Sequence, residues 1–231
     1  MRKLIAAFLL AGSAVAGPAI AADLVPYYPP VIEVPDVDYG VSGGLYLRGS
    51  VAGGAWTAQD AIYCNCATTT FDKWGYGYSV GAGVGYDSGH GIRADVTIDY
   101  LNYGGLATTN GYSVNLRSGL ALANLYYDFS LSGNGYGAGG FGAYVGAGLG
   151  VAKNYSEVMD GSTQHAWGTS LEGAGAVMAG VSYDFGSHVA DLGYRGIYMN
   201  KVMSQPANLA NAYIINNNFI HELRASLRYR F

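Results

Sequence analysis

Charged residues are scarce in this chain, and long apolar runs are missing beyond its first residues. Asp, Glu, Lys and Arg make up 12% of the 231 residues, against about 25% in a typical soluble domain. The net charge of −4 disfavours a nucleic-acid partner, because such proteins carry basic surfaces. No later stretch approaches the ~20 apolar residues of a membrane-spanning helix. We therefore expect neither nucleic-acid binding nor an internal helical anchor.

Cysteine and proline are also rare, whereas glycine and tyrosine are abundant. There are 2 cysteines and 6 prolines, against 36 glycines and 21 tyrosines. The glycines lack the period of three that collagen requires, and glycine costs ~1 kcal/mol at each position inside a helix. Half of the chain is hydrophobic, which argues against a disordered chain. These features favour an all-β protein that needs many small residues.

The first residues have the features of a secretory signal peptide. Arg2 and Lys3 precede an apolar run, and Ala19-Ile20-Ala21 has the small residues of a cleavage site. We expect residues 1–21 to be removed on export, which takes away two cations and changes the net charge from −4 to about −6. Residues 22–43 are rich in proline and predict an extended periplasmic lead. This lead is a passive tether or contacts another envelope component.

From residue 44 onward the apolar period is two, which is typical of β-strands. In the last segment, for example, Leu223 and Leu227 lie on one face, and Arg224 and Arg228 on the other. Eight segments follow this pattern: 44–56, 75–87, 91–103, 113–129, 140–154, 169–185, 188–199 and 220–231. Each is long enough to cross a bilayer as a tilted strand, which needs ~9–11 residues. A break in the alternation at Asn124 predicts a β-bulge.

The connections between these segments alternate in length. Connections 57–74, 104–112, 155–168 and 200–219 are together far longer than 88–90, 130–139 and 186–187. Long loops at one end and short turns at the other are typical of outer-membrane barrels, whose long loops are extracellular. We therefore expect an all-β fold over residues 44–231: a monomeric, transmembrane, up-and-down antiparallel β-barrel of eight strands. Both termini would then lie on the periplasmic side.

Aromatic residues recur where the segments reach the short turns. Three segments end in Tyr-Asp or Tyr-Asp-Phe, and the chain ends in Tyr-Arg-Phe. Because neighbouring residues of a strand point to opposite faces, the aromatic rings would face lipid and the charges the lumen. The repeat predicts a periplasmic aromatic girdle formed by Tyr86, Tyr127, Phe129, Tyr183, Phe185, Tyr229 and Phe231.

Together these features resemble the small outer-membrane β-barrel proteins of Gram-negative bacteria, in particular the alphaproteobacterial surface-antigen and porin-like group. The likeness rests on the signal sequence, the following Ala-Ala-Asp-Leu, the proline-rich lead, the eight segments and the terminal phenylalanine. The end "LRASLRYRF" is similar to the strand that the barrel-assembly machinery recognises, through Leu223, Leu227, Tyr229 and Phe231. The resemblance implies an integral protein of the cell outer membrane, in contact with membrane lipid and lipopolysaccharide. It also implies a structural or surface-interaction role, as for an adhesin or antigen.

Alternation assigns a set of charged side chains to the barrel lumen. Eight strands enclose a space that side chains just fill, and buried charges are costly unless they pair. Segments two and five offer mostly glycine inward, which leaves room for long arginines. We expect a paired network that plugs the lumen, made by Arg48, Arg93, Asp95, Asp99, Arg117, Glu172, Asp191, Arg195, Glu222, Arg224 and Arg228. A narrow ion or water path, which would make the protein a small passive pore, is the alternative.

The sequence offers little for an enzyme or a metal site. An acyl hydrolase needs a serine, a histidine and an orienting carboxylate. His221 is the best placed histidine, but the adjacent Glu222 points to the opposite face. We expect no catalytic, cofactor-binding or metal-binding residues, with a lipid A-modifying enzyme as the second alternative. Cys64 and Cys66 favour a local or intermolecular disulfide over free thiols or a metal site, since the chain is exported.

The long connections are the expected sites of interaction. Loops carry function more often than the elements that they join, and these contain many aromatic and asparagine residues. A host or envelope ligand would bind there. Lys73, Lys153 and Lys201 lie at or near this end, where they would meet lipopolysaccharide phosphates.

Overall fold

The computed structural model describes residues 43–63, 67–131, 139–204 and 213–231. The expected signal peptide (1–21), residues 22–42 of the expected lead, and Cys64 and Cys66 lie outside these residues. The regular elements of the described chain are all β-strands. No helix in this part of the chain is long and apolar enough to cross a membrane.

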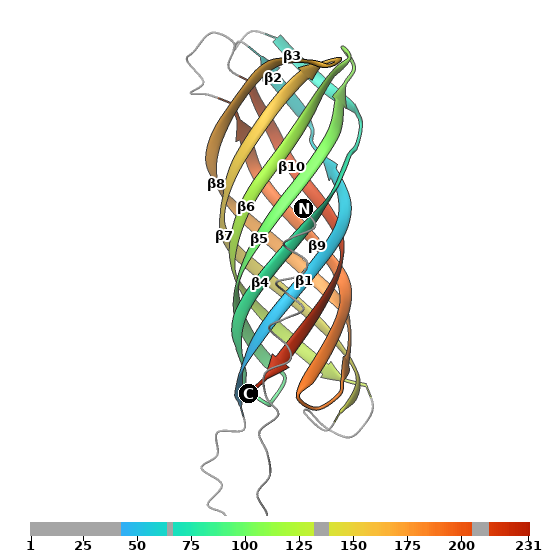
Figure 1. Ribbon diagram of the computed structural model, residues 1–231, viewed down its shortest axis with the longest axis vertical. Helices are drawn as coiled ribbons and strands as arrows, with labels where there is room; N and C mark the ends of the chain where they lie inside the picture. The colour runs from blue at the N-terminus through green and yellow to red at the C-terminus, as the bar shows by residue number, and fades with distance from the viewer. Residues whose placement is uncertain (1–42, 64–66, 132–138, 205–212) are drawn as a thin grey trace, which may run out of the picture. The chain divides into compact units, whose positions relative to one another are not determined.

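Eight long antiparallel strands form a closed ring (Figure 1). They are β1 (Gly44–Thr57), β4 (Gly75–Asp87), β5 (Ile92–Thr108), β6 (Tyr112–Ser130), β7 (Gly140–Asp160), β8 (Thr163–Asp184), β9 (His188–Met203) and β10 (Tyr213–Arg230). Each pairs with the next long strand, and β1 pairs with β10 from Tyr46 opposite Arg230 to Thr57 opposite Phe219. The expected eight-stranded up-and-down barrel is therefore confirmed, and its closure removes the unpaired edges of the sheet.

The two ends of the barrel differ. Strand β1 starts and β10 stops at the same end, where Phe231 N–H donates to the carbonyl of Leu45; we call this the terminal end. Two short strands, β2 (Asp60–Tyr63) and β3 (Ala67–Lys73), lie at the opposite end, which we call the hairpin end (Figure 1). The expected short turns are all at the terminal end.

Strands β2 and β3 prolong the barrel wall. Thr57 pairs with Phe219 and Asp60 with Asn216, so β2 continues β1 in the same register along β10. In the same way β3 pairs with β5 and leads into β4. Beyond the ends of β1 and β4, β2 and β3 therefore take their places in the ring. The prediction of a long loop over 57–74 is wrong for the described residues, because most of them find hydrogen-bonding partners on β5 and β10.

Two other predicted loops are also mostly strand. Strand β5 runs to Thr108 and β6 starts at Tyr112, while β7 runs to Asp160 and β8 starts at Thr163. Only short turns remain, and each contains a glycine with positive φ, Gly111 at 87° and Gly161 at 59°. Glycine adopts this conformation without steric cost. The barrel wall therefore extends well past the segments that alternation predicted.

The predicted β-bulge at Asn124 is absent. Asn124 pairs regularly with Asp95 on β5 and with Gly148 on β7. Its side chain points into the lumen in phase with Leu120 and Leu122, which are also buried. Nothing breaks the alternation of β6. Leu116, Leu120 and Leu122 face inward, whereas Leu125 faces outward, and the expectation that apolar residues face outward misread the first three.

The inward face of β10 does change near the hairpin end. From Asn218 to Arg228 the even-numbered residues of β10 are buried. Before this point the odd-numbered residues Tyr213 and Ile215 are buried instead. Between these two stretches Asn217 has a φ of 51°, a left-handed conformation that asparagine tolerates better than most residues. This local distortion keeps apolar side chains directed into the lumen up to the end of the strand.

Candidate functional site

The lumen next to the terminal end is filled by a charged layer. Arg48 Nη1 lies 3.1 Å from Asp95 Oδ2 and 2.7 Å from the Tyr126 hydroxyl. The hydroxyl of Tyr46 donates to the same carboxylate at 2.9 Å, and Asn124 Nδ2 donates to its other oxygen at 2.8 Å. These bonds satisfy most of the polar atoms, which buried charges require; Arg48 Nε and Asn124 Oδ1 have no protein partner in the described chain.

Two bidentate ion pairs complete this layer. Arg228 donates to both oxygens of Asp191, at 2.9 and 2.8 Å. Arg93 does the same with Asp128, at 2.9 and 3.0 Å, and its guanidinium lies over the ring of Tyr126, 4.0 Å from the centroid. Paired N–H donors match the geometry of a carboxylate, which makes these interactions strong and directional.

A second charged layer lies deeper in the barrel and centres on Arg195, which is completely buried. Its Nε donates to Glu222 at 2.6 Å and its Nη1 to Asp99 at 2.9 Å. The Tyr103 hydroxyl donates to the second oxygen of Glu222 at 2.9 Å. Arg224 is less well satisfied: its Nη2 contacts Ser50 and Asp99, while its Nε and Nη1 have no protein partner in the described chain.

Charged residues also brace the terminal end. Arg230 pairs with Asp184 at 2.8 Å and with Asp87 at 3.6 Å. Each of these carboxylates also accepts a backbone N–H from the turn that follows it, from Gly186 at 2.7 Å and from Gly89 at 3.0 Å. The aspartates of the Tyr-Asp repeats thus stabilise the turns and connect them across the end of the barrel.

Two of the predicted lumen residues do not join the network. Arg117 lies on the outer face of β6 with 54% of its side chain exposed, because the buried Leu116 and Ser118 beside it face inward. Its assignment to the lumen is wrong, and the cause is the misread phase of β6. Glu172 lies half-buried on the inward face of β8, with no ion-pair partner among the described residues.

Two of the inward glycines make room for rings, and no arginine is among the nearest atoms of any inward glycine of β4 or β7. A Cβ at Gly85 would lie 2.5 Å from the ring of Tyr46, and a Cβ at Gly146 would collide with the ring of Tyr126. Both tyrosines donate or accept hydrogen bonds within the charged layer. Glycine therefore supports the network indirectly, by admitting the tyrosines that contact Arg48 and Asp95.

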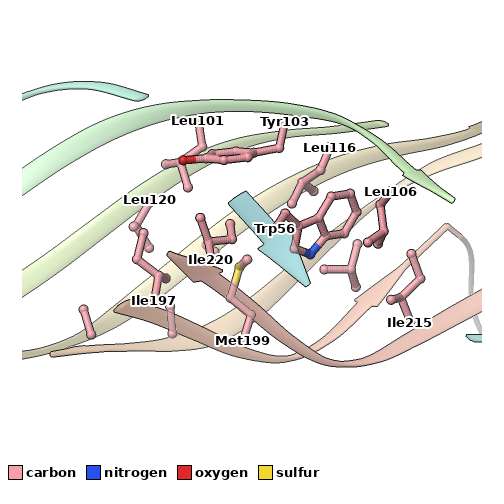
Figure 2. Close-up of a cluster of buried hydrophobic side chains, with 14 of the residues drawn as sticks. Trp56, Leu101, Tyr103, Leu106, Leu116, Leu120, Ile197, Met199, Ile215 and Ile220 are labelled. Atoms are coloured by element: carbon pink, nitrogen blue, oxygen red, sulfur yellow. The ribbon is translucent and has the colours of Figure 1, made fainter. Parts of the chain in front are cut away.

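An apolar layer fills the lumen between the charged layers and the hairpin end (Figure 2). Trp56 is completely buried and donates to Asn218 Oδ1 at 3.1 Å. The other large side chains of this layer are Leu101, Tyr103, Leu106, Leu116, Leu120, Ile197, Met199, Ile215 and Ile220. Sequence reasoning missed this layer, because it assigned apolar residues to lipid. The sequence did contain a signal for it: Leu101 and Tyr103 lie on the same face of their strand as Asp95 and Asp99, which were assigned to the lumen.

The outer face is apolar over a band of defined height. On β4 the exposed side chains run from Tyr76 through Val80 and Val84 to Tyr86. At about 3.3 Å per residue and a tilt of ~40°, this stretch is about 25 Å tall, the height of the apolar band of a transmembrane barrel. An exposed apolar surface of this extent is unfavourable in water, so lipid is the environment that it fits.

Aromatic rings mark the terminal edge of this band. All seven residues assigned to the girdle lie on the outer face there, exposed by between 38% for Tyr183 and 75% for Phe231. Neighbouring rings contact edge to face: the centroids of Tyr127 and Phe129 are 4.8 Å apart, and those of Tyr229 and Phe231 are 5.1 Å apart.

Cations and a histidine lie toward the other edge of the band. Lys73, Lys153 and Lys201 are exposed, and Lys153 and Arg117 lie on the adjacent strands β7 and β6. His221 is on the outer face, where its Nδ1 is 2.8 Å from the Tyr194 hydroxyl, whereas Glu222 is buried in the lumen. The two side chains are therefore separated by the barrel wall, as the alternation predicts.

The closed ring, the filled lumen and the apolar outer band define a class: the chain has the fold of the small outer-membrane β-barrel proteins of Gram-negative bacteria. Neisserial surface protein A has a similar structure, with a TM-score of 0.50 and 22% sequence identity, over 81% of this chain and 99% of that protein. The outer membrane protein OprG from Pseudomonas aeruginosa aligns with a TM-score of 0.45 and 16% identity, over 82% of this chain and 97% of its own.

Similarity in sequence reaches bacteria of the genus Brucella. An uncharacterized protein of Brucella suis biovar 1 is 28% identical, over 92% of this chain and 93% of its own length. An uncharacterized protein of Brucella abortus has the same identity over the same shares. No protein-family model matches the chain.

Proposed function

We propose that this protein is an integral, non-catalytic barrel of the outer membrane with a structural or surface-interaction role. The observation that carries the proposal is the filled lumen. Two charged layers and one apolar layer lie in series across it, and their large side chains are almost completely buried. A barrel closed in this way offers its outer face and its hairpin end to partners, and not a path through its centre.

The proposal includes a location and an orientation. Residues 1–21 act as the signal peptide, residues 22–43 as the periplasmic lead, and residues 44–231 as the barrel. The terminal end faces the periplasm and the hairpin end faces outward. The last strand, β10, with the Phe231 that follows it, is the part that the assembly machinery engages during insertion, and the mature protein is a monomer.

Lipopolysaccharide is the proposed lipid partner of the outer face. Lys73, Lys153 and Lys201 are exposed beyond the apolar rows of their strands, and Arg117 adds a fourth cation next to Lys153. Cations at this level meet the phosphates of the outer leaflet. Tyr155 supports the group, since its ring lies 5.9 Å from the guanidinium of Arg117.

The hairpin end is the proposed surface for a host or envelope ligand. Thr68 and Thr70 on β3 and Asn110 in the turn after β5 are exposed there. Such short polar side chains suit hydrogen bonding to a partner. A disulfide that involves Cys64 and Cys66 would stabilise this end, and mass spectrometry of the unreduced protein tests it.

Single-channel recording in planar bilayers tests the plugged lumen. The native protein is expected to show no stable conductance, whereas the triple variant Trp56→Gly, Arg93→Ser, Arg195→Ser, which removes one large side chain from each of the three layers, is expected to conduct. Heat-modifiable gel migration verifies that both are folded. Uniform, long-lived openings of the native protein would instead support the small-pore alternative.

Lipid A analysis tests the absence of catalysis. Lipid A from a strain that lacks the gene is expected to have the same mass spectrum as lipid A from its parent. The enzyme alternative would be supported if the deletion strain showed altered lipid A acylation. In that case the native gene should reverse the change, and a copy that carries His221→Ala should not.

A further inference from the structure

A cavity lies at the hairpin end of the lumen, beyond the apolar layer. Its volume is about 150 Å³, and its walls come from β2, β3, β5, β6, β7 and β10. Two pairs of apolar residues face each other across it. Ala61 pairs with Ile215 on one wall, and Val114 pairs with Val158 on the opposite wall. We call this cavity the vestibule.

The vestibule exists because the side chains that β2, β3 and β5 contribute to it are short. In the layer below it, Trp56, Leu106 and Leu116 meet across the lumen and leave it closed (Figure 2). An eight-stranded lumen is narrow enough for such side chains to fill. Alanine, valine and threonine do not reach across the same width, so the space between Ala61 and Val158 stays open.

Several of the polar side chains around the vestibule have hydrogen-bond partners. The Tyr213 hydroxyl donates to Ser156 Oγ at 2.8 Å, and Thr108 Oγ1 donates to the carbonyl of Tyr112 at 3.2 Å. Burial raises the pKa of Tyr213 above its ordinary value, so this phenol remains neutral. None of the described residues that line the vestibule is charged.

The volume of the vestibule and its uncharged lining indicate which kind of ligand it could bind. Ala61, Val114, Val158 and Ile215 give the vestibule an apolar inner surface, and an apolar cavity of about 150 Å³ accepts benzene or xenon. We propose that the vestibule binds one small, uncharged apolar molecule of about the size of a benzene ring. Its floor is the apolar layer, so the molecule enters and leaves through the hairpin end. This binding site goes beyond the structural role proposed above and does not depend on it.

Methyl nuclear magnetic resonance of the full chain in lipid nanodiscs tests the proposal, with benzene as the probe. The methyl signals of Val114, Val158 and Ile215 are expected to shift and saturate as benzene is added. Those of Val151 and Val177, which are exposed on the outer face, report partition into lipid and are expected to change without saturation. Nuclear Overhauser contacts from benzene to the vestibule methyls would identify the bound position.

A matched pair of substitutions controls for non-specific effects. Ala61→Phe fills the vestibule and is expected to abolish the saturable shifts, while Ala123→Phe on the outer face of β6 is expected to retain them. If Ala61→Phe fails to fold by heat-modifiable migration, Val158→Phe takes its place. The proposal is overturned if the native signals do not saturate, if filling the vestibule leaves saturation intact, or if Ala123→Phe removes it.

Discussion

At the scale of single residues, position in the barrel decides what an arginine does. Arg195 and Arg117 have the same side chain, yet Arg195 is completely buried between Asp99 and Glu222 and Arg117 is half exposed on the outer face. A buried charge that loses its partner is far more costly than an exposed one. The two residues should therefore respond very differently to substitution.

Arg195→Ala is expected to lower the free energy of unfolding by about 3–5 kcal/mol, because Asp99 and Glu222 would remain buried without their cation. Arg117→Ala is the control, and its effect should be within about 1 kcal/mol, as for an exposed ion pair. Urea unfolding of the vesicle-embedded proteins, followed by tryptophan fluorescence, measures both. Equal effects of the two substitutions would show that the second charged layer does not stabilise the barrel.

Substitutions of an inward and an outward glycine can be compared in the same way. Gly146→Val places atoms against the ring of Tyr126 and is expected to cost about 1–3 kcal/mol, the usual effect of overpacking. Gly119→Val adds the same atoms on the outer face of β6, where nothing lies within 4 Å of the new Cβ, and should change stability little. The same unfolding measurement applies, and a stable Gly146→Val protein would contradict the close packing of the lumen.

At the scale of elements, the strands are longer than their apolar pattern indicates. Strand β8 has 22 residues and β7 has 21, more than a bilayer crossing requires. Beyond the apolar band the outward residues become polar, and threonine, which favours strands, is frequent in β3. Strand β2 is held by β10 and β3 by β5, so the connection over 57–74 is mainly part of the wall.

Disulfide trapping tests this extension of the wall. In a Cys64→Ser, Cys66→Ser background, Asp60→Cys with Asn216→Cys is expected to oxidise readily, because these residues are direct partners on β2 and β10. Asp60→Cys with Ile214→Cys is offset by two residues, and its Cα atoms are about 7–8 Å apart, so it should oxidise poorly. Mass spectrometry of unreduced protein reads out both pairs; equal oxidation would indicate a loose loop.

At the scale of the whole molecule, the barrel is polarised along its axis. Charged layers lie near the terminal end, the apolar layer lies toward the hairpin end, and the vestibule lies beyond it. The exposed lysines lie toward the hairpin edge of the apolar band, and the row of Tyr-Asp and Tyr-Arg-Phe rings lies at its terminal edge, although Trp74 and Tyr76 are exposed near the hairpin edge as well. This asymmetry fits a barrel with one end in the periplasm and the other at the cell surface.

A protease site tests the orientation. Inserted at Ser162, in the turn between β7 and β8, it is expected to be cut by protease added to intact cells. The same sequence inserted at Ser187, in the turn between β8 and β9, is expected to be cut only after the outer membrane is opened. Heat-modifiable migration verifies that both proteins are folded, and the reverse pattern of cleavage would invert the topology.

Period-two alternation and turn residues are local properties, so they could be recognised in the amino-acid sequence. They were enough to predict the eight long strands, their order and the aromatic rows that end in Tyr229 and Phe231. The sequence by itself also placed nine of the charged lumen residues, from Arg48 to Arg228, on the buried side. The inward orientation of Leu116 and Leu120 and the outward orientation of Arg117 depend on the folded barrel and could not be predicted. Burial depends on which strands lie opposite, because an apolar side chain is equally stable against lipid and against a closed lumen. For the same reason the sequence did not predict the pairing of β2 with β10. It did not predict the vestibule either, because residues distant in the sequence form its walls.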